Sequence, residues 1–82
     1  MKVRVLVFSL LQDIVGDPEI EVSLDKERAD IADLLACLFE SYPPLRDWND
    51  KLLIAVDCEY ADRTTPISEG QEIALMPPVQ GG

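Results

Sequence analysis

The chain opens with two short segments that alternate in polarity. In residues 3–8, VRVLVF, a valine occupies every second position, so the three valines share one face of a predicted β-strand. In residues 19–24, EIEVSL, apolar and polar residues alternate again, and a Gly-Asp-Pro turn signal at 16–18 precedes them. The first 24 residues therefore predict a hairpin with a fairly long loop.

The next segment changes to the period of a helix. Its apolar residues recur at the spacing of one helix face: Ile31, Leu34, Leu35 and Leu38. Asp30 is a candidate N-cap, and Pro43-Pro44 should stop the helix because a residue before proline avoids the α conformation. We expect this apolar face to pack in the core rather than on a partner.

The rest of the chain reads as strands and turns. It predicts a polar loop at 46–50, a strand at 51–57, a brief edge strand at 58–60, a turn segment at 64–71 and a last strand at 72–77. The order β-β-α-β-β-β predicts an α+β fold of the β-grasp, or ubiquitin-like, type, with one main helix across a mixed sheet of about five strands. Residues 1–76 should form this domain and 77–82 an extended C-terminal tail, because Pro77 cannot donate to a strand ladder.

The same alternation predicts what lies on the sheet face away from the helix. If the valines of the first strand face the helix, the opposite face carries Leu6, Phe8, Ala74 and Met76. Little chain is left to cover these side chains, and a contiguous exposed apolar patch usually marks an interface. The alternative is that loop residues fold over the patch.

Composition excludes several kinds of function. The chain has 82 residues, one domain's length, with 7 basic and 16 acidic residues and a net charge of −9. A nucleic-acid surface needs clustered Lys and Arg, so none is expected. The charge indicates either a partner with a basic docking surface or simply high solubility. The apolar start is too short for a membrane span and lacks a cleavage site, so we expect a cytoplasmic protein.

No catalytic or metal-binding set is evident. Histidine is absent, which removes the commonest general base and most zinc sites. Neither of the glycine-rich nucleotide-binding motifs, G-x-x-x-x-G-K-[ST] and G-x-G-x-x-G, occurs. Cys37 is expected to be an inert buried thiol, and Cys37 and Cys58 form neither a disulfide framework nor a metal site. Asp57 is expected to be a turn residue rather than a catalytic acid.

The remaining candidate for chemistry is the ending, LMPPVQGG. Pro77-Pro78 stiffens the root, and the six residues from there reach about 20 Å when extended. Gly82 offers a carboxylate with no Cβ beside it, which suits passage through a narrow tunnel and activation on another protein's ATP. The alternative is an incidental end.

These residues resemble a known family. The ending PPVQGG, the preceding EGQEIAL and the opening VRVLVFSLLQDIVG resemble the small subunits of molybdopterin synthase, which are β-grasp sulfur carriers, over essentially the whole chain. The resemblance implies that Gly82, next to Gly81, is adenylated by a ubiquitin-activating-like enzyme and converted to a thiocarboxylate. ATP and magnesium would belong to that partner, and this chain would bind no cofactor or metal. Sulfur would then pass to a pterin precursor in the large synthase subunit.

The resemblance also implies which residues meet partners, and where this chain departs. Partner-binding positions would be Phe8, Tyr60, Met76, Pro77, Pro78, Val79 and Gln80. Departures from the family's common residues are Gln12, Asp57, Gln71 and Met76, which affect partner compatibility rather than the carrier chemistry. The open alternatives are a carrier for thiamine thiazole or cysteine synthesis, a ubiquitin-like protein modifier, and a binding module with an incidental tail.

Overall fold

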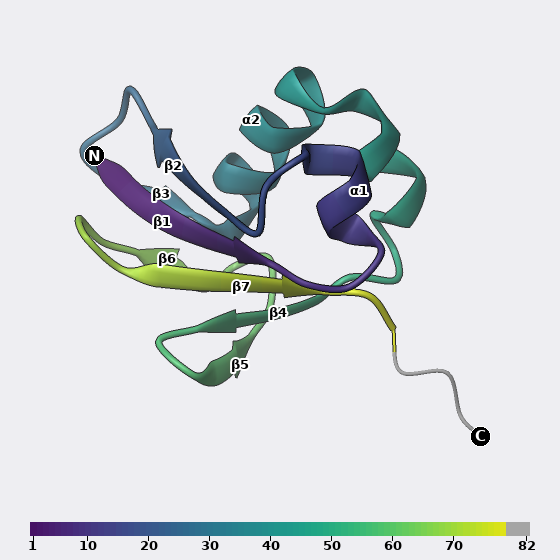
Figure 1. Ribbon diagram of the computed structural model, residues 1–82. Helices are drawn as coiled ribbons and strands as arrows, with labels where there is room; N and C mark the ends of the chain where they lie inside the picture. Colours follow the sequence, from purple (N-terminus) through teal and green to yellow (C-terminus); the bar gives the residue numbers. More distant parts are fainter. Residues whose placement is uncertain (79–82) are drawn as a thin grey trace.

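One mixed sheet and one long helix across it dominate the structure, a computed structural model that describes residues 1–78 (Figure 1). The sheet contains β1 (Lys2–Val7), β2 (Glu19–Ser23), β4 (Leu53–Val56), β5 (Glu59–Ala61) and β7 (Glu72–Met76), in the order β2-β1-β7-β4-β5. β1 and β7 run parallel, and the other neighbours are antiparallel. The expected ubiquitin-like β-grasp fold is confirmed, and β5 is the edge strand that the sequence predicts.

The main helix, α2 (Ile31–Ser41), begins and ends where the sequence predicts. Asp30 is its N-cap and forms a capping box with Asp33, each carboxylate accepting the other residue's backbone N–H at 3.0 Å. Lys26 donates to Asp33 at 2.8 Å, and this hydrogen bond is the main reason that the pKa of Asp33 lies below its ordinary value. The Asp33 carboxylate therefore stays ionised in mild acid, and its part in the capping box is lost only as the pH falls through that lowered pKa.

Four short elements were not expected from the sequence. They are α1 (Leu11–Val15), the 3-10 helix η1 (Pro43–Trp48), and a second small sheet of β3 (Ala29–Asp30) with β6 (Pro66–Ile67). The polar loop expected at 46–50 is wrong in part, because η1 extends to Trp48. Leu11 and Leu45 are fully buried, so each anchors its short helix to the core. Gly16, at φ 88°, ends α1 in the left-handed conformation that glycine adopts readily.

The core lies between α2 and the sheet face predicted to meet it. All the strand residues that alternation assigned to this face are at most 2 % exposed: Val3, Val5, Val7, Ile73 and Leu75. The apolar face of α2 packs against them, and the helices all lie on this side of the sheet (Figure 1). No helix within residues 1–78 is long and apolar enough to cross a membrane.

Replacing the N-cap, Asp30→Ala, is expected to lower the free energy of unfolding by about 1 kcal/mol, because it leaves the Asp33 backbone N–H without its acceptor. Urea denaturation followed by circular dichroism measures this loss. Asp30→Asn, which keeps a side-chain acceptor, is the matched control and should lose much less. Equal losses for the two variants would contradict the capping role.

Candidate partner-docking face and tail root

The sheet face without helices is apolar at one end. Strand register places Leu6, Ala74, Ala55 and Tyr60 in one row across β1, β7, β4 and β5. The next row pairs Met76 with Leu53, and Phe8 follows β1 beside them, its backbone N–H donating to the Leu75 carbonyl at 3.1 Å. We call these seven residues the apolar face.

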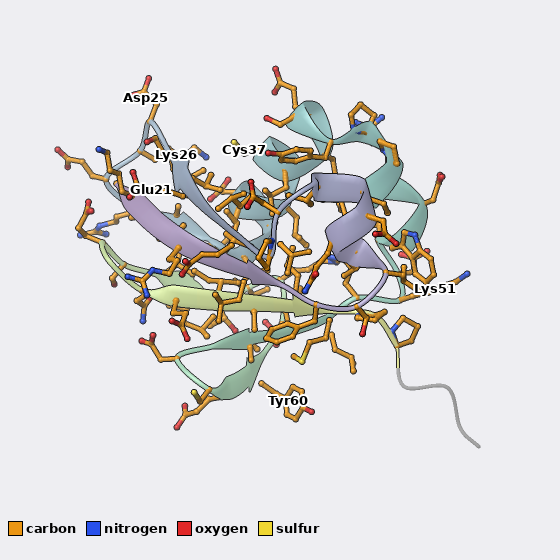
Figure 2. All side chains as sticks on the ribbon, in the orientation of Figure 1. Glu21, Asp25, Lys26, Cys37, Lys51 and Tyr60 are labelled. Atoms are coloured by element: carbon orange, nitrogen blue, oxygen red, sulfur yellow. The ribbon has the colours of Figure 1, made fainter. Side chains whose placement is uncertain are left out.

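A shallow groove crosses the apolar face. Its volume is about 290 Å³, and it is lined by Phe8, Ala55, Cys58, Tyr60, Ala74 and Met76. Phe8 is 42 % exposed and Tyr60 is 79 % exposed, so loop residues do not fold over these two side chains. Figure 2 shows Tyr60 projecting from β5, away from the helices. The structure therefore brings Phe8, Tyr60 and Met76 together, whereas their binding role stays a prediction.

Charged residues border the apolar face at the end away from the tail. Arg4 lies 3.2 Å from Glu19 and 3.5 Å from Glu72, and Lys2 lies 3.7 Å from Glu21. These pairs are largely exposed, so they add little to stability. They do confine the apolar surface to the end where β7 finishes at Met76 and the tail begins.

The β4–β5 hairpin turns tightly beside the groove. Asp57 and Cys58 form its two-residue turn at φ 48° and 73°, both in the left-handed region. The Asp57 carboxylate accepts from the Glu72 backbone N–H and from the Gln71 amide, each at 3.1 Å. The expectation that Asp57 is a turn residue is confirmed. Its carboxylate ties the hairpin turn to the start of β7.

Two of the predicted departures from the family pattern, Asp57 and Gln71, thus contact each other. The neutral amide of Gln71 donates to the Asp57 carboxylate. An acidic residue at position 71 would instead place two negative charges together. The two positions are therefore joined in one hydrogen bond at the hairpin, and their effect on partner compatibility stays a prediction.

The predicted tail residues are described only in part. Pro77 and Pro78 follow β7 and are half-buried. Val79, Gln80, Gly81 and Gly82 lie outside the described residues, so their predicted roles stay predictions.

The two cysteines differ in their surroundings. Cys37 is only half-buried against the core and not fully buried as expected, whereas Cys58 is exposed on the groove. Both are free thiols, and residues 1–78 contain no cluster of three or more metal-ligating side chains. Three residues at this face were not expected from the sequence: Ala55 and Cys58, which line the groove, and Leu53, which pairs with Met76. The alternation of the strand at 51–57 could have placed Leu53 and Ala55.

Fold and site together define a small ubiquitin-like protein with an apolar sheet face at the root of a Gly-Gly tail. The family model described as the ThiS family matches residues 5–82, and the chain belongs to this family of sulfur carriers.

Curated relatives match over nearly the full length. The molybdopterin synthase sulfur carrier subunit of Dictyostelium discoideum is 30 % identical, covering 96 % of this chain and 94 % of its own. The protein of the same description from Mycobacterium tuberculosis is 32 % identical, covering 100 % of this chain and 99 % of its own.

Solved structures agree on the fold and differ in described role. SAMP1 (small archaeal modifier protein 1) of Haloferax volcanii superposes with a TM-score of 0.88 at 26 % identity, covering all of both chains. A chain from the complex of subunits 1 and 2 of the molybdopterin-converting factor of Helicobacter pylori gives a TM-score of 0.70, also at 26 % identity and full coverage of both.

Proposed function

We propose that this chain is the sulfur carrier subunit of a molybdopterin synthase. The Gly82 carboxylate attacks the α-phosphate of ATP on an activating enzyme, which gives an acyl-adenylate and releases pyrophosphate. A sulfide-level nucleophile then attacks the acyl carbon, AMP leaves, and a thiocarboxylate remains. In the large synthase subunit the thiocarboxylate sulfur attacks a pterin precursor during molybdenum cofactor synthesis. Water then cleaves the acyl–sulfur bond, which leaves the sulfur on the pterin and regenerates the Gly82 carboxylate.

The observation that carries this proposal is the position of the apolar face. It ends at Met76, and the Pro77-Pro78 root follows directly, so a partner docked on the face is already beside the tail. The groove exposes aromatic and sulfur-containing side chains, which are typical of protein interfaces. The descriptions of the curated relatives support the choice of molybdopterin synthase over other carriers.

The proposal divides the chemistry among three proteins. This chain supplies the reacting terminus and a docking surface, while general acids, bases, ATP and magnesium belong to the ubiquitin-activating-like adenylyltransferase and the large synthase subunit. The absence of histidine from the chain agrees with this division. All three proteins are proposed to act in the cytoplasm.

Intact mass spectrometry tests the chemistry directly. The chain is incubated with the activating enzyme, ATP, magnesium and a sulfide source, and a mass increase equal to replacement of one oxygen by sulfur is expected. The increase should localise to the C-terminal peptide and should be absent when ATP is omitted. An unchanged mass, with an activating enzyme shown to be active on another carrier, would overturn the proposal.

A protein modifier is the second candidate, because the chain superposes over its full length on SAMP1 of Haloferax volcanii, which is described as a small archaeal modifier protein. In this case Gly82 would form isopeptide bonds with lysines of other proteins. A tagged form of the chain, expressed in cells of its source organism, would then give high-mass conjugates that survive denaturation. A sulfur carrier instead restores molybdopterin formation in cells that lack their own small subunit.

Docking of the large subunit on the apolar face is expected to protect Cys58 from alkylation. Cys58 is exposed on the groove, so a partner that fills the groove excludes the reagent. The rate is measured by peptide mass spectrometry on the free chain and on the complex. Cys37, half-buried beside Lys26 and Glu40 on the α2 side, is the internal control and should react at an unchanged rate. Equal Cys58 rates in both states would contradict docking at this face.

A further inference from the structure

A lysine and a tryptophan stand together just before β4. The backbone N–H of Lys51 donates to the Trp48 carbonyl at 2.8 Å, and that of Leu52 donates to the same oxygen at 3.0 Å. The Lys51 ammonium lies 5.8 Å from the centre of the Trp48 ring, a cation–π contact. Trp48 itself packs partly into the core. The backbone of Lys51 is therefore bound to the Trp48 carbonyl, and its ammonium lies over the partly buried Trp48 ring.

This pair lies at the end of the sheet where the tail begins. Leu53, two residues after Lys51, pairs with Met76, the last residue of β7. The start of β4 and the end of β7 are thus neighbours, and Pro77-Pro78 leaves from this point. Figure 2 shows Lys51 at the end of the molecule where β7 finishes and Lys26 at the opposite end.

Lys51 differs from the other lysines in its charge environment. Lys2 is paired with Glu21, and Lys26 with Asp33. Within residues 1–78, Lys51 makes no ion pair and its ammonium makes no hydrogen bond, although the chain has a net charge of −9. At the other border of the apolar face, Arg4 is already neutralised by Glu19 and Glu72. Lys51 is therefore a positive charge at the tail root that this part of the chain leaves unneutralised.

A partner that covers the apolar face and takes up the tail must also approach the tail root. That approach removes water from Lys51, and an ammonium group that loses its water is unfavourable unless an anion replaces it. Asp47 and Asp50 lie close to Lys51 in the sequence, but neither forms an ion pair with it, so the Lys51 ammonium stays available to a partner. Complementarity here requires a negative group on the partner.

We propose that Lys51, held on Trp48, is a specificity contact that binds a carboxylate of the large synthase subunit where the tail enters it. The inference rests on the proposed function for the identity of the partner. The contact sets the orientation of the large subunit on the apolar face, because it places the acidic group of that subunit at the tail root. Lys51 takes no part in the sulfur chemistry itself.

The experiment measures the dissociation constant of the purified complex with the large subunit for matched charge variants. Lys51→Gln is expected to weaken binding about 5- to 10-fold and Lys51→Glu about 30-fold or more at low ionic strength, whereas Lys51→Arg should stay within about 3-fold. These effects should shrink at high salt, which a purely structural role of Lys51 would not produce. Because Lys51 is exposed, the thermal unfolding midpoints should be nearly unchanged.

Lys26→Gln and Lys26→Glu are the controls, since they change the net charge equally at the opposite end of the molecule and should leave binding unchanged. If the wild-type chain binds the large subunit and Lys51→Glu binds it with the same dissociation constant, the inference is overturned but the proposed function is not. Failure of the wild-type chain to bind the large subunit would overturn the proposed function, and the inference with it. A Lys51→Glu effect on the activating enzyme only would assign the contact to that partner and would also overturn the inference.

Discussion

A chain shortened to end at Gln80 is expected to fold normally and to accept no sulfur. Removing Gly81 and Gly82 withdraws the reacting carboxylate by about 7 Å along an extended tail and places a side chain next to it. Misplacing a reacting group by only about 1 Å can cost about 100-fold in rate, so molybdopterin formation should fall below detection. The product is measured with the purified large subunit, activating enzyme, ATP and a sulfide source.

Two controls separate the chemistry from the fold. The thermal unfolding midpoint of the shortened chain should match that of the full chain, because the buried core residues found within residues 1–78 lie between Val3 and Leu75. Gly82→Ala keeps the length and adds only a Cβ at the tip, so its loss should be smaller than that of the deletion. Undiminished product from the shortened chain would mean that the terminus does not carry the sulfur.

Leu35→Ala is expected to lower the free energy of unfolding by about 2–5 kcal/mol. Leu35 lies on the core-facing side of α2 and is 2 % exposed, so the substitution leaves a cavity under the helix. Small domains have total stabilities of about 5–15 kcal/mol, and this one change removes a large share. Urea denaturation followed by circular dichroism gives the value.

Glu40→Ala is the matched control on the same helix, because Glu40 is exposed and alanine is a good helix former. Its effect should stay within about 0.5 kcal/mol. Leu35→Met, which nearly conserves volume, should lose less than about 1.5 kcal/mol and remains measurable if the alanine variant does not fold. A Leu35→Ala loss below about 1 kcal/mol would contradict the assignment of this helix face to the core.

The local sequence pattern was sufficient to predict those helices and strands that are long enough to show a period of apolar residues. The strand valines, the leucines of α2 and the Asp30 cap all lie where the sequence predicts, because alternation and capping depend on neighbours in the chain. α1, η1 and the small sheet were missed for the opposite reason. Elements of two to six residues are not stable alone, and here they depend on single buried anchors such as Leu11 and Leu45.

At the candidate site, too, the sequence predicted some residues and not others. The alternation along the strands predicted that Phe8 and Met76 share a face, and the resemblance to sulfur carriers added Tyr60. Neither shows that Cys58 lines the same groove, or that Asp57 and Gln71 tie the hairpin to β7. Those contacts join residues far apart in the sequence, so they depend on strand pairing that no local pattern specifies.

The sequence by itself determined the fold class and the face to which each long-strand residue points, and the chemistry proposed for the Gly-Gly terminus also rests on the sequence. Only the tertiary structure decided that parallel β1 and β7 set Phe8 beside Met76, that β5 adds Tyr60, and that Lys51 lies at the tail root. The physical reason is that side-chain direction follows from the backbone period of one segment, whereas neighbours across a sheet follow from which strands pair and in which register.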